Sequence, residues 1–164
     1  MQNCSSNVTI SSGRLSAVGG LIGSSIGAVS NSYAMGSVTL KNANAASYAG
    51  GLVGATGCFD GWCGTIASSY STAAVTAPGG GTIGGLVGSD TTSGGISNAY
   101  WDTTTSGVTN PGQGAGTPAN DPGITGLTTA QLQANLPPGF DPAVWGEDPG
   151  VNGGLPYLLA NPPQ

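Results

Sequence analysis

Apolar and polar residues recur in three similar copies within the first 107 positions of the chain. Each copy carries a glycine phrase, GGLIG at 19–23 and GGLVG at 50–54 and 84–88, so the phrases begin 31 and 34 residues apart. A second phrase follows each one, and in it Val29, Ile66 and Ile96 occupy equivalent places. A tyrosine comes four residues after each of these. This spacing is typical of solenoid, propeller or array repeats.

The residues retained between copies predict strands rather than helices. Val, Ile, Thr and Tyr dominate them, turn residues interrupt them every few positions, and Val38 and Val75 each follow a tyrosine by five residues. We predict an all-β fold over 1–107, a short parallel β-solenoid of about three coils with aliphatic side chains stacked inside. The glycine pairs suit tight corners that need either positive φ or close backbone approach.

Tyr33, Tyr70 and Tyr100 form a ladder of equivalent aromatic positions. Aromatic side chains usually pack in a core or at a corner, which favours a structural role for the ladder. The alternative is an exposed aromatic stripe that binds sugars.

The rest of the chain predicts a loop followed by a cap. Residues 108–125 are rich in Gly, Pro, Asn and Thr and predict a linker or long surface loop. In 126–164, Thr128 and Gln131 form a capping-box pattern that predicts one short helix, ended by Pro137 and Pro138. The large apolar residues that follow predict a cap that seals the last coil, whose edge needs protection. A ligand-binding aromatic patch around Trp145 is the alternative.

The other end of the repeat region has no such cover in the sequence. Residues 7–10 predict half a coil, and nothing before them is long enough to close it. An uncovered strand edge readily pairs with another chain, so end-to-end self-association through this edge is expected.

Composition narrows the classes of partner. The chain has 31 Gly and 11 Pro, but 38% apolar residues and a net charge of only −5 favour a packed fold over disorder. Arg14 and Lys41 are the only basic residues, too few to neutralise nucleic-acid phosphates or to hold an anionic lipid surface. No apolar run is long enough to span a membrane, so no membrane insertion is expected. A surface built from Ser, Thr, Asn and Gly is typical of secreted bacterial repeat proteins.

The stretch CFDGWC at 58–63 is the most individual motif. Four residues separate Cys58 from Cys63, which is not the CxxC spacing of a redox or zinc pair, and in an oxidising compartment it predicts a local disulfide. The loop would then present Phe59, Asp60 and Trp62 as a recognition site, because exposed aromatic residues on a rigid loop make good contact anchors. Alternatively, Trp62 folds back on the flank of the body. Cys4 is left over.

Catalytic and metal-binding chemistry is poorly represented. The chain has no histidine, which excludes Ser-His-Asp and Cys-His arrangements and histidine-ligated zinc. Of its seven acids, only Asp60, Asp90 and Asp102 lie in the repeats, at unrelated registers. A polysaccharide-degrading enzyme would require Asp60, Asp90 and a third acid to converge in a groove. Asp141 and the acids at 147–148 match no calcium motif. We expect no catalytic residue, no metal and no cofactor.

The repeats and the tail resemble a known family. YAGGLVG (48–54), VSNSYAMGSV (29–38) and ISNAYW (96–101) resemble the GLUG repeat of large bacterial surface and secreted proteins, including filamentous-haemagglutinin-like adhesins of two-partner secretion systems and some metallopeptidases. AYWDTTTSG (99–107), GLTTAQLQ (126–133), LPPGFDPAVWG (136–146) and LPYLLANPP (155–163) are similar to the closing segment of such adhesins. The resemblance implies a secreted, elongated β-helix on the bacterial cell surface.

Together these patterns predict a function in adhesion rather than catalysis. The expected role is a structural or adhesive part of a secreted or cell-surface adhesin, whose partner is a host-cell glycan or surface receptor. A purely structural stalk or self-assembling filament unit is the first alternative. A polysaccharide-degrading β-helix enzyme is the second.

Overall fold

The computed structural model describes residues 1–13, 16–41 and 46–163, so Arg14 lies outside the described residues. Its elements are nearly all strands, with one short α-helix, and three sheets are entirely parallel. This confirms the predicted all-β class. The strands of the first sheet are β1 (Ser5–Ser12), β4 (Ala28–Ser30), β5 (Tyr33–Leu40), β10 (Thr65–Ser71), β11 (Ala74–Thr76), β14 (Ile96–Asp102) and β16 (Ile124–Leu127).

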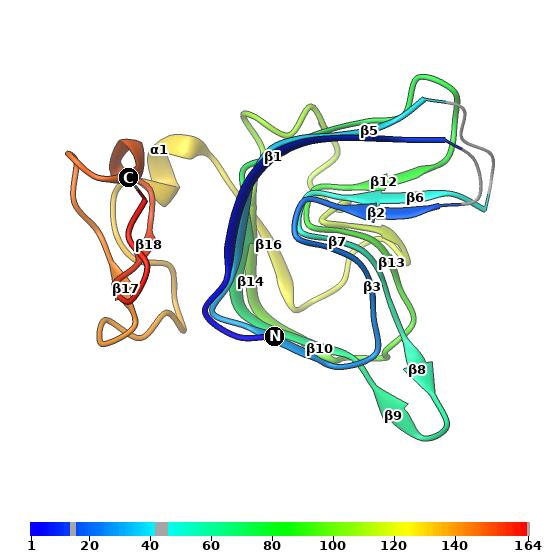
Figure 1. Ribbon diagram of the computed structural model, residues 1–164, viewed down its shortest axis with the longest axis horizontal. Coiled ribbons are helices and arrows are strands. Elements are labelled where there is room, and N and C mark those ends of the chain that lie inside the picture. The colour runs from blue at the N-terminus through cyan, green and yellow to red at the C-terminus, as the bar shows by residue number, and fades with distance from the viewer. Residues whose placement is uncertain (14–15, 42–45, 164) are drawn as a thin grey trace.

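The second and third sheets are smaller, and on each of its first three passes the chain visits all three sheets in the same order (Figure 1). Each of these three passes runs through the first sheet, returns beneath it in the second, and turns sharply into the third. The second sheet contains β2 (Ala17–Gly19), β6 (Tyr48–Gly50) and β12 (Thr82–Gly84). The third contains β3 (Ile22–Ser25), β7 (Val53–Thr56), β13 (Val87–Asp90) and β15 (Ala115–Thr117).

The register read from the sequence is confirmed by the strand pairing. Ile66 pairs with Val29 on one side and with Ile96 on the other. Tyr70 likewise pairs with Tyr33 and Tyr100. Equivalent residues of successive passes therefore lie beside one another, at the spacing that parallel strands impose.

The first sheet has more layers than three repeats would supply. Its order is β1-β5-β10-β14-β16, so one layer precedes and another follows the passes that carry the tyrosines. The predicted half coil at 7–10 is part of an eight-residue strand, β1, in which Ser5 stands in register with Tyr33. In four layers, the residue two positions before the ladder tyrosine, or before Ser5 in the first layer, has the left-handed backbone conformation. Asparagine tolerates this conformation well. These residues are Asn3, Asn31, Ser68 and Asn98.

The glycine phrase is explained by close approach of backbones. Gly50, Gly51 and Gly54 all have ordinary negative or extended φ, so positive φ is not the reason for them. A Cβ on Gly50 would stand 2.0 Å from the carbonyl oxygen of Val53, and one on Gly51 would stand 2.3 Å from the hydroxyl of Ser71. A Cβ on Gly54 would meet the backbone of the second sheet at 2.3 Å. The third sheet can fold back against the second only because these side chains are missing.

The interior lies between the three sheets and is almost entirely aliphatic. Trp101 is its one large aromatic residue, fully buried beside the glycine corner, and its indole N–H has no partner among the described residues. Val29, Ile66 and Ile96 are at most 5% exposed, as interior stacking predicts.

The tail covers the side of the first sheet, not its end, which corrects the predicted sealing of the last coil. The buried tyrosines Tyr33, Tyr70 and Tyr100 point outward and form one cluster with Phe140 and Trp145 of the tail. Outward tyrosines on three adjacent layers make an apolar strip that must be covered, and the tail supplies the cover. Its elements are α1 (Thr129–Leu132), β17 (Trp145–Gly146), a 3-10 helix (Asn152–Gly154) and β18 (Tyr157–Leu158).

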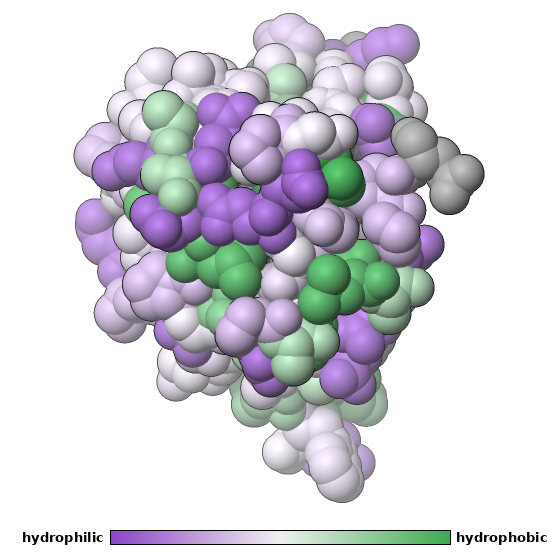
Figure 2. Space-filling view, turned by 90° about the vertical axis from the view of Figure 1, so that its left-hand side faces the viewer, coloured by the Kyte–Doolittle hydropathy of each residue, from purple (hydrophilic) through white to green (hydrophobic). Residues whose placement is uncertain are grey.

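Specific contacts fix the tail in place. The rings of Tyr33 and Tyr70 stack at 5.2 Å between centroids, and those of Phe140 and Trp145 stack at 4.4 Å. The Tyr70 hydroxyl donates a hydrogen bond to the carbonyl oxygen of Pro156 at 2.6 Å. This buried hydroxyl therefore has a hydrogen-bond partner in the tail. The predicted capping box before α1 is confirmed. Figure 2 shows the face that the tail forms, with small apolar areas near its middle among polar residues.

The segment 108–125 is irregular over most of its length, as its composition predicts, but it also contributes strands to the body. Val108 and Ala115 are buried, β15 adds a strand to the third sheet, and β16 begins at Ile124. Parallel pairing to β13 and β14 incorporates this segment into the body. Gly and Thr in it are compatible with short strands because the neighbouring layer supplies the hydrogen bonds.

A substitution at the glycine corner tests the close-packing explanation. Gly85→Ala should lower the free energy of unfolding by at least about 2 kcal/mol, because overpacked cores must shift backbone and side chains. The added Cβ would stand 2.2 Å from the Trp101 ring. Gly27→Ala is the control, since a Cβ there meets nothing within 4 Å and should change stability by less than about 0.5 kcal/mol. Urea unfolding measures both, and equal effects would contradict the explanation.

Candidate functional site

A short antiparallel hairpin projects from the body, away from the tail (Figure 1). Its strands are β8 (Cys58–Phe59) and β9 (Trp62–Cys63). Asp60 and Gly61 form the turn with φ of 50° and 81°. Positive φ at both central residues defines the turn type that favours Asp-Gly, so the local sequence itself specifies the hairpin.

The disulfide and the aromatic pair lie on opposite faces of this hairpin. Cys58 is bonded to Cys63, directly across the ladder, and Phe59 is paired with Trp62 one step nearer the turn. Side chains directly opposite one another share a face, and the next pair along faces the other way. The disulfide therefore braces the strands without covering either ring.

Both rings are exposed to solvent. Phe59 is 69% exposed and Trp62 is 76% exposed, so the alternative in which Trp62 folds back on the flank is wrong. All ring-to-ring contacts in the described part of the chain involve the ladder and the tail, and neither hairpin ring takes part in them. Two large apolar groups thus stand in water on a rigid support, which is the arrangement of a contact site.

The other aromatic candidates are structural. Tyr33, Tyr70 and Tyr100 are at most 6% exposed, which overturns the alternative of a sugar-binding stripe. Burial raises the pKa of each of these hydroxyls above 10.0, most strongly for Tyr70. Trp145 is 1% exposed, so a ligand-binding patch around it is also wrong.

The acidic side chains of the repeats differ in their exposure and in their hydrogen-bond partners. Asp60 is exposed at the hairpin turn. Asp102 is fully buried and accepts hydrogen bonds from the Thr104 amide at 2.7 Å and the Thr129 hydroxyl at 2.5 Å, so it joins β14 to the start of α1. In the tail, Asp141 and Asp148 each accept a hydrogen bond from the amide two residues on, a turn-forming role.

Asp90 and Asp121 form a carboxyl pair that the sequence did not reveal. Asp90, at the end of β13, is 3% exposed and accepts a hydrogen bond from the Thr92 amide at 2.8 Å. Asp121 accepts one from the Gly123 amide at 2.8 Å. Burial raises the pKa of Asp121 above its ordinary 3.8, and the hydrogen bond and negative charge of Asp90 raise it further, against the lowering effect of Gly123. Residues 31 apart carry no signal of such a pairing.

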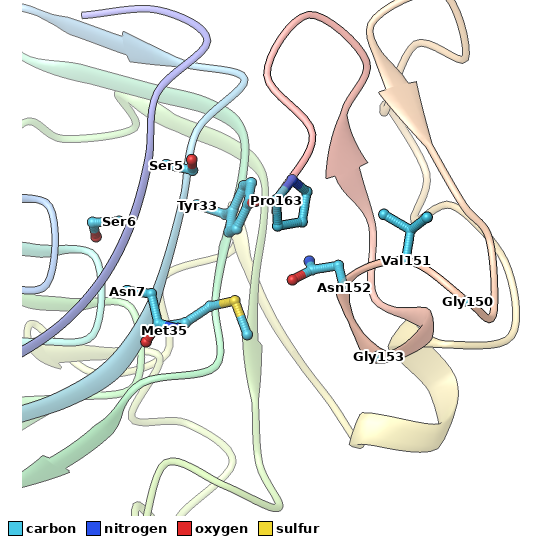
Figure 3. A pocket seen from close by; sticks show the side chains of 10 residues that line it. All are labelled: Ser5, Ser6, Asn7, Tyr33, Met35, Gly150, Val151, Asn152, Gly153 and Pro163. Atoms are coloured by element: carbon cyan, nitrogen blue, oxygen red, sulfur yellow. The ribbon is translucent and has the colours of Figure 1, made fainter.

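A pocket of 460 Å³ lies between the first sheet and the tail (Figure 3). Ser5, Asn7 and Met35 come from the first two layers, and Asn152 and Pro163 face them from the tail. No charged side chain lines it. A second pocket, of 310 Å³, is lined by Asp121. Neither contains Asp60 or Asp90.

In the described part of the chain, no group of three or more His, Cys, Asp or Glu is placed to hold a metal ion. No helix over those residues has the length and apolarity needed to cross a membrane. Cys4 is a partly exposed free thiol.

Comparison of the chain with protein-family models, curated proteins and solved structures found no match.

The Asp90–Asp121 pair predicts an unusual dependence of stability on pH. A raised pKa means that the folded chain favours protonated Asp121, a contribution that is present at low pH and lost as the pH rises through the raised value. Asp121→Asn should therefore stabilise the protein near neutral pH, and the gain should vanish toward about pH 3. Urea unfolding across this range measures it. Parallel pH profiles of wild type and Asp121→Asn would refute the pairing.

Proposed function

We infer that this chain is an adhesive segment of a secreted or cell-surface bacterial protein. In this proposal the three parallel sheets form a short β-solenoid, and the solenoid holds the Cys58–Cys63 hairpin outward as a recognition element. The exposure of both Phe59 and Trp62 carries the proposal. The stacked layers make the support stiff, and a preorganised contact loses less conformational entropy on binding.

Two further observations support this proposal. The disulfide is compatible with an oxidising, extracytoplasmic compartment. The repeat phrases that resemble GLUG repeats fall in the strands and corners of the three sheets, where a repeat of that kind would need them. The partner in this view is a glycan or receptor on a host-cell surface.

An enzyme of polysaccharide breakdown receives less support. Asp90 is almost wholly buried and hydrogen-bonded to the Thr92 amide, so its carboxyl is not offered to a substrate. Asp60 stands on the exposed turn of the hairpin rather than in either pocket described above. A glycosidase needs two carboxyl groups that flank one bond of the substrate.

Removal of the Trp62 ring tests the adhesive function. Trp62→Ala should weaken binding to host cells or to a glycan array by about tenfold or more, as expected for a central aromatic anchor. Its stability should be unchanged because the side chain is 76% exposed. Leu159→Ala removes an apolar side chain that is 47% exposed in the tail and should leave binding intact. Unchanged binding by Trp62→Ala would remove the hairpin from the mechanism.

A structural stalk or filament unit is the second candidate, and β1 favours it. This eight-residue strand pairs only with β5 among the described residues, and it contains no proline or charged residue to block a further strand. Stacking of successive molecules through this edge would extend the parallel sheets.

Light scattering after size-exclusion chromatography tests the filament candidate. The apparent mass should rise with protein concentration, and Val8→Lys should reduce the rise, since a charge on an edge strand opposes pairing. Val8 is 41% exposed on β1, and Leu159→Lys in the tail provides a control. A strict monomer at high concentration would count against stacking.

A further inference from the structure

The hairpin combines two exposed aromatic rings with one negative charge. Phe59 and Trp62 share a face, and Asp60 lies between them in sequence at the exposed turn. Nothing crowds this tip, since even a Cβ on Gly61 would meet no atom within 4 Å. Phe59 is 69% exposed and Trp62 is 76% exposed, so both rings are accessible to a ligand.

The charge of the whole chain has the same sign as the hairpin. The net charge is −5, and residues 56–64 contain no basic side chain. A positively charged group approaching the hairpin is therefore attracted at long range, whereas an anionic one is repelled. Aromatic faces attract Lys and Arg cations through their electron-rich centres, and Arg also stacks flat on such rings.

We propose that the hairpin binds a Lys or Arg side chain of a partner protein, with Phe59 and Trp62 contacting the cation and Asp60 balancing its charge. This inference rests on the proposed adhesive function and adds the chemistry of its partner, a protein that presents basic side chains. Charge complementarity favours this occupant over an anionic glycan and over a second copy of this acidic chain, both of which the negative charge of the hairpin and of the chain repels. The rings supply contact area and the carboxylate supplies selectivity.

The tryptophans of the chain provide a direct readout at this site. Trp101 and Trp145 are at most 1% exposed, whereas Trp62 is 76% exposed, so a ligand at the hairpin changes the emission of Trp62 alone. The probe is a short, blocked Arg-containing peptide, and its matched control has citrulline in place of arginine, which keeps the shape and removes the charge. A neutral oligosaccharide is a third probe.

The Arg peptide should shift or quench Trp62 emission at millimolar concentration, and the citrulline peptide should bind at least about fivefold more weakly. Added salt should weaken binding of the Arg peptide. Asp60→Asn should raise its dissociation constant about two- to fivefold, the size expected for an exposed ion pair. Asn-Gly forms the same turn as Asp-Gly, so this variant keeps the hairpin. Trp62→Phe should abolish the signal and thereby show that it comes from this residue.

Three results would overturn the inference: equal binding of the arginine and citrulline peptides, no effect of Asp60→Asn, or no response of Trp62 to the Arg peptide. These failures differ from failure of the adhesive function. If the neutral oligosaccharide or host cells bind in a Trp62-dependent way while the Arg peptide does not, adhesion stands and the cationic partner is wrong. If Trp62→Ala binds cells like the wild type, the adhesive role of the hairpin fails as well.

Discussion

The close backbone contact at the glycine corner is the constraint on which the rest of the structure depends. The chain must leave the second sheet and return against it in the third, with carbonyl oxygens and amides where a Cβ would otherwise stand. Only glycine fits at Gly50 and its equivalents, and the corner recurs in three successive passes because each layer rests on the previous one. The corner also sets the space for interior side chains, such as Trp101 over Gly85.

Layering also places equivalent outward-facing side chains of successive layers next to one another on the outer face of the sheet. Three outward tyrosines stack into a strip, and a strip of that size is not stable in water. Phe140 and Trp145 of the tail cover this strip of tyrosines. Tyr70 and Tyr100 also donate hydrogen bonds to carbonyl oxygens of the tail. The tail therefore serves as a lateral brace that ties adjacent layers together, while β16 leads into it directly from the sheet.

The hairpin is not part of the repeating pattern of strands that forms the three sheets. It occurs in one pass only, carries its own turn and its own covalent brace, and needs little from the body to hold its shape. That independence is useful for recognition, because the exposed rings can vary without disturbing the stacked layers. The body in turn gives the hairpin a fixed direction, away from the face that the tail occupies.

The sequence alone determined the features that depend on local chemistry or on repetition. Equivalent residues must meet in parallel layers, so the alignment of Val29, Ile66 and Ile96 was sufficient to give their register. The capping box at Thr128 and the Asp-Gly turn between the cysteines are likewise specified by neighbours in the chain. Only the tertiary structure decided which way the tyrosines face, because either face of a strand can be buried until a partner covers it. The same holds for the lateral position of the tail, the strand in 108–125 and the pairing of Asp90 with Asp121, which all arise from contacts between residues distant in the chain.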